Sequence, residues 1–293
     1  MDKVVVIYGP TAVGKSAIAV ELAKYMNGEI ISADSMQIYK HLNVGSAKVT
    51  EQEMQGIKHH LIDIKEPYED YSVSEFCTDA KKCIKDILSR NKTPIIVGGT
   101  GLYIKSLVEE YDFAKVKKHD EFRESLNNLN NEEIYERVLN LNKNSKVDKN
   151  NRQRLIRTLE KLTFGKDTET SKPPEYDYRV FAIVDDRQKI YDRINLRAEE
   201  MLYKGLIYEA QYLRSLNLPE DNLALKAIGY KEVFPYLDDK ATLDECLEIL
   251  KQKSRNYAKR QFTFLNQFKD ITKIEYLGVK ETARIICRMV EEE

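Results

Sequence analysis

The sequence predicts an α/β protein in which a parallel sheet with crossover helices is interrupted by an inserted helical domain. Up to Tyr111, short β-branched apolar runs alternate with amphipathic segments of helical period, and a glycine-rich loop separates the first pair. This alternation is typical of parallel sheets whose strands are joined by helices. Beyond Tyr111 the chain becomes polar, and its apolar residues recur with helical spacing only.

The elements of the first part can be placed from their apolar patterns. Residues 4–9 (VVVIYG) predict a buried strand, the loop GPTAVGKS follows it, and residues 16–26 have the spacing of a helix. The other elements expected before Tyr111 are strands at 28–34, 59–64 and 93–99 and a helix at 74–91.

The second part of the chain leaves the sheet and then returns to it. Residues 131–142 and 152–162 predict helices, and two prolines at 173 and 174 end this stretch. A strand is expected at 179–186, followed by mostly helical sequence to the C-terminus. The expected division is a P-loop NTPase-like core of residues 1–112 and 176–293 with a helical insertion at 113–175.

Composition limits the class of protein. The net charge of -1 gives no global sign of nucleic-acid binding, so any such binding must come from local clusters. No apolar run approaches the roughly 18 residues of a membrane span, and no secretory signal is visible. The four cysteines are scattered without metal-type doublets and are expected to be reduced thiols. We therefore expect a cytoplasmic protein without a membrane partner.

The loop after the first strand fits the phosphate-binding pattern G-x-x-x-x-G-K-[ST] in the strand–loop–helix context that this pattern requires. Its backbone N–H groups form an anion cradle, Lys15 adds a positive charge, and Ser16 can hold Mg²⁺. The loop does not identify its ligand, because a nucleoside triphosphate and an allylic diphosphate present the same two-phosphate group. The candidate diphosphate-binding residues are Gly9, Thr11, Ala12, Val13, Gly14, Lys15 and Ser16.

The acidic residues near the sheet edge are unusual for a P-loop ATPase. The strand ending at Val97 runs into Gly-Gly-Thr, whereas many P-loop NTPases have an acid there that helps to hold Mg²⁺. The nearest acid at a strand end is Asp34, at the edge where open α/β sheets bind ligands. The residues alone leave three roles open for Asp34: metal partner, helix cap or turn former, and general base.

Taken together, several segments resemble the tRNA dimethylallyltransferase (tRNA isopentenyltransferase) family, in order and across most of the chain. They are GPTAVGKSAIAVELA, SADSMQIYKHLNVGSAKVT, HHLIDI, VGGTGLYIKSL, NNRQRLIRTLE, KAIGYKE and YAKRQ. The P-loop alone is shared by many enzymes, but its combination with DSMQIYK, GGTGLY and a late AKRQ is specific. The sequence departs from the family pattern at Lys226, where arginine or glutamine is usual.

The resemblance implies a reaction and its participants. The donor would be dimethylallyl diphosphate, the acceptor the N6 amine of adenosine 37 in a tRNA anticodon loop, and the products modified tRNA and diphosphate, without ATP consumption. Mg²⁺ is the implied cofactor, with Ser16 as its expected protein ligand. The residue matching Asp34 is the family's general base, and the one matching Thr100 lies beside the reacting groups. We expect the chain to act as a monomer.

The resemblance also implies which residues contact tRNA. The basic segment around Arg154 and Arg157 would grip the anticodon stem-loop, with the helical insertion assisting. A second basic run on the C-terminal side contributes Arg255, Lys259 and Arg260 as further candidates; without the resemblance it reads as a solvated helix face. The candidate tRNA-binding residues are Asp34, Ser35, Met36, Gln37, Thr100, Arg123, Gln153, Arg154, Leu155, Ile156 and Arg157.

Two other functions share parts of this pattern. A small-molecule or nucleotide kinase would use the same phosphate-binding loop and would turn over ATP. A nucleotide-gated RNA-binding module without covalent chemistry would use the basic runs alone and would bind RNA without modifying it.

Overall fold

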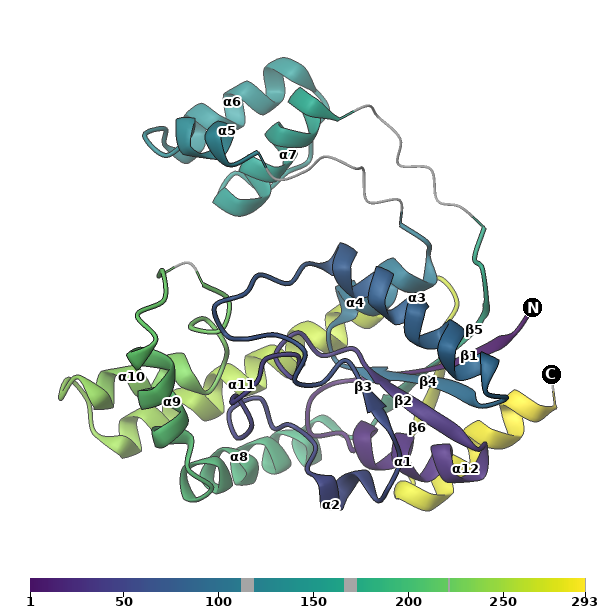
Figure 1. Ribbon diagram of the computed structural model, residues 1–293. Helices are drawn as coiled ribbons and strands as arrows, with labels where there is room; N and C mark the ends of the chain where they lie inside the picture. Colours follow the sequence, from purple (N-terminus) through teal and green to yellow (C-terminus); the bar gives the residue numbers. More distant parts are fainter. Residues whose placement is uncertain (112–118, 166–172, 221, 293) are drawn as a thin grey trace. The chain divides into compact units, whose positions relative to one another are not determined.

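The core of the protein is an all-parallel β-sheet (Figure 1). The computed structural model describes residues 1–111, 119–165, 173–220 and 222–292. The expectation of a parallel sheet is confirmed. In spatial order, the strands of this described part are β3 (His59–His60), β2 (Gly28–Ser32), β4 (Thr93–Gly98), β1 (Lys3–Tyr8), β5 (Asp177–Val184) and β6 (Thr272–Glu275).

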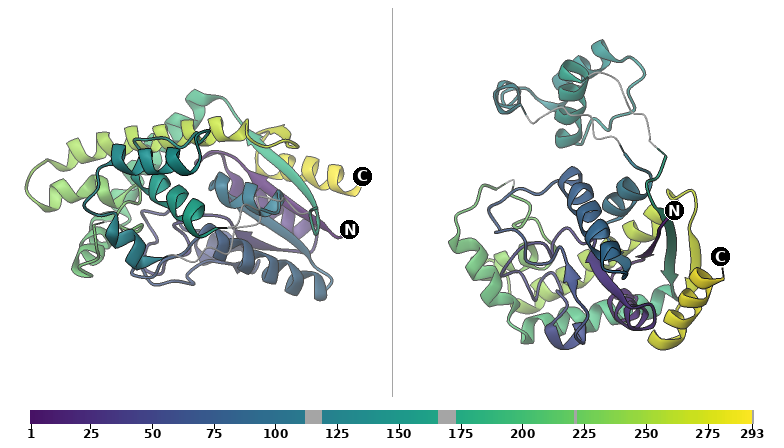
Figure 2. Two further views of the ribbon diagram at one scale, coloured as in Figure 1. Left: turned by 90° about the horizontal axis from the view of Figure 1, so that it is seen from above. Right: turned by 45° about the vertical axis from the view of Figure 1, so that its right-hand side comes forward.

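Helices cover both faces of the sheet. In Figure 1, α1 (Lys15–Tyr25) and α12 (Val279–Glu291) lie on one face, and α3 (Val73–Ser89) and α4 (Gly101–Val108) lie on the other. The remaining helices of the core pack against one another beside the sheet, and Figure 2 shows the longest of them crossing the core. They are α8 (Arg187–Tyr203), α9 (Leu206–Ser215), α10 (Tyr230–Leu237) and α11 (Leu243–Leu265), with the single turn α2 (Glu51–Met54) at the edge.

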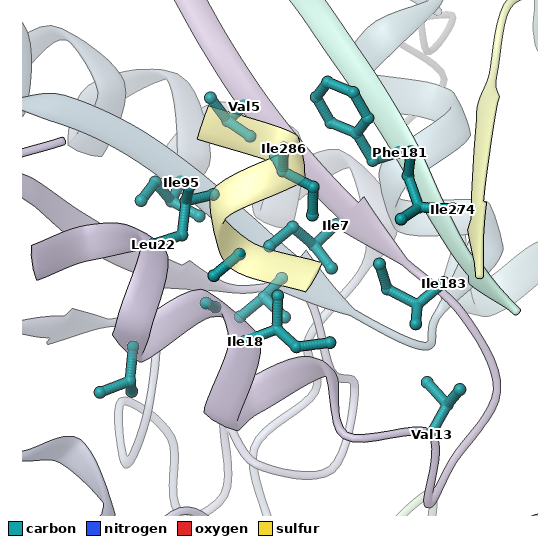
Figure 3. Packing of buried hydrophobic residues seen from close by; sticks show 14 of the residues in the cluster. Val5, Ile7, Val13, Ile18, Leu22, Ile95, Phe181, Ile183, Ile274 and Ile286 are labelled. Carbon is teal, nitrogen blue, oxygen red and sulfur yellow. The ribbon is translucent and has the colours of Figure 1, made fainter. Parts of the chain in front are cut away.

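A hydrophobic core lies between the sheet and the α1–α12 layer (Figure 3). Ile18 and Leu22, one turn apart on α1, bury their side chains with Ile286 of α12 against Ile7 and Ile95 of the sheet. A fully buried aliphatic side chain of this kind contributes about 1.5–3 kcal/mol. This packing fixes β1 and α1, and therefore the loop between them.

The chain divides into two compact units, Met1–Val108 with Pro174–Glu293, and Glu109–Pro173. We call them the core unit and the insertion. The expected boundary at 112/113 lies outside the described residues. The described part of the insertion consists of α5 (Asp120–Ser125), α6 (Asn131–Leu141) and α7 (Arg152–Phe164). Its own small core is made of Leu126, Ile134, Val138, Leu155 and Leu159.

Two local features differ from the sequence-based expectations, and a third adds detail to them. The strand expected through residue 64 is wrong beyond His60, because Leu61 and Asp63 adopt left-handed backbone angles (φ 60 and 54) that end it. Within the mostly helical sequence after Asp186, α8 ends before Gly205, whose φ of 102 starts the next helix, α9. The short edge strand β6 was not expected at all in this largely helical region.

Candidate active site

Three loops meet at the carboxyl ends of neighbouring strands. The phosphate-binding loop follows β1, the segment with Asp34 follows β2, and Gly98-Gly99-Thr100 follows β4, which lies between the other two strands. A cavity of about 670 Å³ opens there. Its lining includes Lys15, Ser16 and Asp34. The structure therefore brings the candidate phosphate site and the candidate base into one cavity, at the edge where open α/β sheets bind ligands.

The phosphate-binding loop has the geometry of an anion cradle. Gly14 has a φ of 96, a left-handed conformation that favours glycine, and it is the N-cap of α1, whose first backbone N–H groups have no partner within the helix. Lys15 donates from Nζ to the carbonyl oxygen of Pro10 at 2.6 Å. Thr11 and Ala12 line the cavity, whereas Val13 is fully buried in the core and packs there. Gly9 lies outside the lining.

The charge state of Lys15 is set by its surroundings. Burial lowers the pKa of its ammonium group to about 7, with the carboxylate of Asp34 opposing that change and the guanidinium of Arg197 adding to it. Burial also lowers the pKa of Arg197. Two cations thus share a poorly solvated cavity, an arrangement that an anion would relieve.

Asp34 forms a turn with its own loop. Its Oδ1 accepts the backbone N–H of Met36 at 2.9 Å and, more weakly, that of Gln37 at 3.4 Å. The turn places Ser35, Met36 and Gln37 around the cavity, and all three line it. Thr100 lies just behind: its Oγ1 accepts the backbone N–H of Ser35 at 3.1 Å.

Three residues at the cavity were missed in the sequence. Arg197 of α8 points toward the phosphate-binding loop, with Nη1 3.5 Å from Thr11 Oγ1 and Nη2 3.3 Å from the carbonyl oxygen of Ala47. Tyr257 and Gln261 of α11 also line the cavity. The sequence carried one signal for Arg197, since it follows Arg193 by one helical turn and so lies on the same helix face. Both arginines line the cavity.

The basic run on α11 divides into different environments. Arg255 donates to the side chain of Asn195 at 2.5 Å, so it ties α11 to α8. Arg260 lines the main cavity and stacks over the ring of Tyr257 at 5.5 Å. Lys259 is exposed and borders a shallow hollow along α11 together with Arg260. Lys226, the departure from the family pattern, lines the main cavity.

In the insertion, the candidate RNA-contacting residues fall into two groups. Gln153 and Arg154 are exposed near the start of α7, whereas Leu155 is fully buried and Ile156 packs against the same core. The side chain of Leu155 therefore stabilises the insertion, and only its backbone can face a ligand.

Arg123 and Arg157 share one carboxylate. Glu160 is completely buried and accepts from Arg123 through Nε (3.0 Å) and Nη2 (2.8 Å), and from Arg157 Nη1 at 2.5 Å. It also accepts the backbone N–H of His119 at 2.8 Å. Against the opposing effect of burial, these bonds lower the pKa of Glu160 to about 2. Glu160 thus holds two candidate RNA-binding arginines in fixed positions.

The cavity offers few oxygen ligands for Mg²⁺, so a metal ion bound there would need oxygens from a substrate as well. The described residues contain no cluster of three or more acids, histidines or cysteines that could hold a metal. The Ser16 hydroxyl and the Asp34 carboxylate nevertheless line the same cavity. Mg²⁺ commonly takes one or two protein oxygens and completes its shell with substrate phosphates and water. The residues therefore fit Mg²⁺ that arrives with a diphosphate.

No helix among the described residues is long and apolar enough to span a membrane.

Known proteins resemble the chain over most of its length. Residues 37–268 match the family model described as IPP transferase. The chain is 47% identical over 275 residues to a tRNA dimethylallyltransferase of Anoxybacillus flavithermus, covering 91% of this chain and 88% of the relative. It is 45% identical to the same enzyme of Lactococcus lactis subsp. cremoris, covering 95% and 93%.

Solved structures give the same result. A tRNA isopentenylpyrophosphate transferase of Bacillus halodurans matches with a TM-score of 0.77 and 35% identity, covering 100% of this chain and 96% of that one. A eukaryotic dimethylallyltransferase acting on tRNA matches with a TM-score of 0.82 and 29% identity, covering 94% and 74%. The shared fold, the continuous family match and the close relatives together place the protein: the chain belongs to the IPP transferase family.

Proposed function

We propose that the protein transfers a dimethylallyl group from dimethylallyl diphosphate to the N6 amine of adenosine 37 in a tRNA anticodon loop and releases diphosphate. The observation that carries this proposal is the single cavity in which a phosphate cradle, with Lys15 and Ser16, lies beside the carboxylate of Asp34. A group-transfer site needs both parts, one for the leaving anion and one for the proton of the nucleophile.

The adenine amine is a weak nucleophile because its lone pair is delocalised into the ring. As the nitrogen forms its bond to the allylic carbon, one N–H proton must leave, and Asp34, which lines the cavity, would accept it. Thr100, hydrogen-bonded to the neighbouring Ser35, holds this loop in position. In the described part of the chain no hydrogen-bond donor contacts Oδ2 of Asp34, so one carboxylate oxygen can serve the substrate.

On the other side of the reaction, the allylic C–O bond breaks and its electron pair goes to the diphosphate. Lys15, Arg197 and the loop N–H groups surround the place where that negative charge grows. Bound Mg²⁺, held by Ser16 and diphosphate oxygens, would supply further positive charge there. Ile194, Ala198 and Met201 give the cavity an apolar wall, which suits the allyl group and limits its capture by water.

The tRNA would be held partly by the insertion. Arg154 is exposed on α7, and Arg123 and Arg157 are only partly covered on the same unit. Arginine side chains of this kind bind phosphate oxygens of RNA. The adenosine must leave its stack to enter the cavity, which costs a few kcal/mol.

The test is direct. The purified protein is incubated with Mg²⁺, labelled dimethylallyl diphosphate and a tRNA with adenosine at position 37, and the digested RNA is analysed by mass spectrometry. We expect dimethylallyladenosine without ATP, and none from the same tRNA carrying guanosine at position 37. ATP hydrolysis or phosphorylation of a small molecule, with no modified nucleoside, would replace this proposal with the kinase alternative. RNA binding without any product would favour the RNA-binding module.

A further inference from the structure

Gln261 joins segments of the chain that are far apart in the sequence. The residue is 4% exposed, and both the oxygen and the nitrogen of its side-chain amide form hydrogen bonds. Oε1 accepts the backbone N–H of Thr11 at 2.8 Å, in the phosphate-binding loop, and Nε2 donates to the carbonyl oxygen of Gly99 at 2.9 Å. Its backbone oxygen accepts the hydroxyl of Tyr8 at 2.8 Å. One residue of α11 therefore bridges the loops after β1 and β4.

The contact with Gly99 is very close. A Cβ added at Gly99 would lie 2.1 Å from Nε2 of Gln261, so only glycine allows the amide to reach this backbone. The site needs one acceptor and one donor on the same small planar group. An amide provides both, whereas a carboxylate lacks the donor and an aliphatic side chain lacks both.

Tyr257 extends the connection. It precedes Gln261 by one helical turn, and its buried hydroxyl lies near the side chains of Thr100 and Gln261. Thr100 in turn accepts the backbone N–H of Ser35 at 3.1 Å, next to Asp34. Through Gln261 and the adjoining backbone of Gly99 and Thr100, hydrogen bonds thus connect Thr11 in the phosphate-binding loop to the turn that carries Asp34.

We propose that Gln261 is a positioning residue that fixes the phosphate-binding loop relative to the Gly98–Thr100 turn, and that Tyr257 extends this restraint to the turn of Asp34. This inference rests on the function proposed above. Transfer requires the allylic carbon, held through its diphosphate, and the amine, held near Asp34, to meet within about 3–3.5 Å, and a misplacement of about 1 Å can cost roughly 100-fold in rate. Gln261 and Tyr257 contribute by setting that spacing.

The experiment uses the full-length protein with two changes at this position. Gln261→Met keeps the approximate shape of the side chain and removes both polar ends. Gln261→Glu keeps an acceptor, removes the donor to Gly99, and brings a negative charge toward the diphosphate. Gln252→Met, an exposed position on the same helix, is the matched control. Tyr257→Phe removes only the hydroxyl.

Three quantities are measured for each variant: the single-turnover transfer rate with saturating substrates, the Kd of Mg-diphosphate by calorimetry, and the Kd of tRNA. For Gln261→Met we expect the rate to fall about 10- to 100-fold while the Kd of tRNA stays within about twofold. Gln261→Glu should weaken diphosphate binding more than Gln261→Met does, because of its charge. Tyr257→Phe should lower the rate and leave the Kd of diphosphate unchanged, and Gln252→Met should behave as wild type.

A folded Gln261→Met protein whose rate and diphosphate Kd match those of wild type would overturn the inference. Should Gln261→Met fail to fold by circular dichroism and thermal unfolding, Tyr257→Phe decides, and a wild-type rate in that variant has the same effect. Failure of the proposed function is distinguishable: the wild-type protein would then make no modified nucleoside, while diphosphate binding, which needs no tRNA, still reports whether Gln261 holds the phosphate-binding loop.

Discussion

Asp34 Oδ1 lies 2.9 Å from the backbone nitrogen of Met36, within the loop that follows β2. The sequence left a turn-forming role and a role as general base open for this residue, and the geometry makes the two compatible. One oxygen closes the turn and thereby fixes the direction of the carboxylate. The other oxygen, Oδ2, accepts no hydrogen bond from the described residues and can therefore accept a proton from the substrate.

Asp34→Asn separates these two roles. Asparagine keeps an Oδ1 acceptor for the turn but is a very weak base, so the loop should stay in place while proton removal fails. We expect transfer to fall about 100- to 10,000-fold, with the Kd values of tRNA and diphosphate within about threefold of wild type. Single-turnover kinetics and calorimetry measure both. Near-normal turnover would remove Asp34 from the role of base.

Lys15 predicts a proton linkage in diphosphate binding. Its pKa is lowered to about 7 in the unliganded cavity, so part of the population is neutral near pH 7.5. A bound anion favours the charged form and raises this pKa, so binding should take up protons at that pH. Calorimetry in buffers of different ionisation enthalpy measures the uptake.

The lowered pKa of Lys15 also makes the stability of the folded protein depend on pH. Because the folded pKa of Lys15 lies below that of the unfolded chain, the unfolded state binds more protons between pH 7 and about 10.5. The contribution of Lys15 to stability therefore increases as pH rises through this window.

For the measurement of proton uptake, Lys15→Arg is the matched control, since arginine stays protonated throughout. Equal proton uptake in wild type and Lys15→Arg would contradict the linkage.

Arg197→Met tests the second cation of the cavity. The substitution keeps an unbranched side chain against the apolar wall and removes the charge near Thr11. Hydrogen bonds to charged groups contribute about 1.5–3 kcal/mol, so we expect diphosphate to bind about 10- to 100-fold more weakly. The Kd of tRNA should not change. Arg284→Met, an exposed arginine on α12, is the control, and equal diphosphate affinities in the two variants would exclude Arg197 from the anion site.

Arg154→Ala tests the contact of the insertion with RNA. Loss of one phosphate contact should weaken tRNA binding and reduce the slope of log K against log salt by about 1. Filter binding over a range of salt concentrations provides the measurement. Arg137→Ala, an equally exposed arginine on α6 outside the matched motif, should leave the slope unchanged. An unchanged slope for Arg154→Ala as well would place the RNA elsewhere.

Glu160→Gln tests the clamp that holds Arg123 and Arg157. The carboxylate has a pKa of about 2 in the folded chain, below its ordinary value of 4.5, so its stabilising effect is complete above pH 4.5 and is lost as the pH falls toward 2. The glutamine variant should destabilise the insertion by about 1–3 kcal/mol at neutral pH and lose less stability on acidification. Hydrogen exchange of α7 amides from pH 7 to 3 would show it, and equal protection in both proteins would contradict the clamp.

The parts of this protein that the sequence predicted are local. The strand–loop–helix from Lys3 to Tyr25 carries its own apolar periods and its own glycine, so nearby residues determine it. Gln261 was missed because its structural role depends on hydrogen bonds to Thr11, 250 residues away, and Gly99, 162 residues away. In the sequence it was the last residue of the AKRQ motif that contributes to the family resemblance, and no role was assigned to it.

Leu155 shows the converse difficulty. It falls within a motif that resembles an RNA-binding segment, yet helical geometry turns its side chain into the core while Arg154 beside it faces solvent. A linear motif cannot separate the two without knowing which helix face is covered. Similarly, the strand expected to continue past His60 ends because of backbone angles at Leu61, where the apolar pattern gives no warning.

The position of the insertion has a consequence for how the chain is made. β1 is one of the two middle strands of the sheet, yet one of its neighbours, β4, precedes the insertion and the other, β5, follows it. During synthesis, therefore, one edge of β1 stays open until the whole insertion has left the ribosome. An unpaired apolar edge of this kind invites pairing with other chains. Because the insertion has a core of its own, it can fold before β5 arrives to close the sheet.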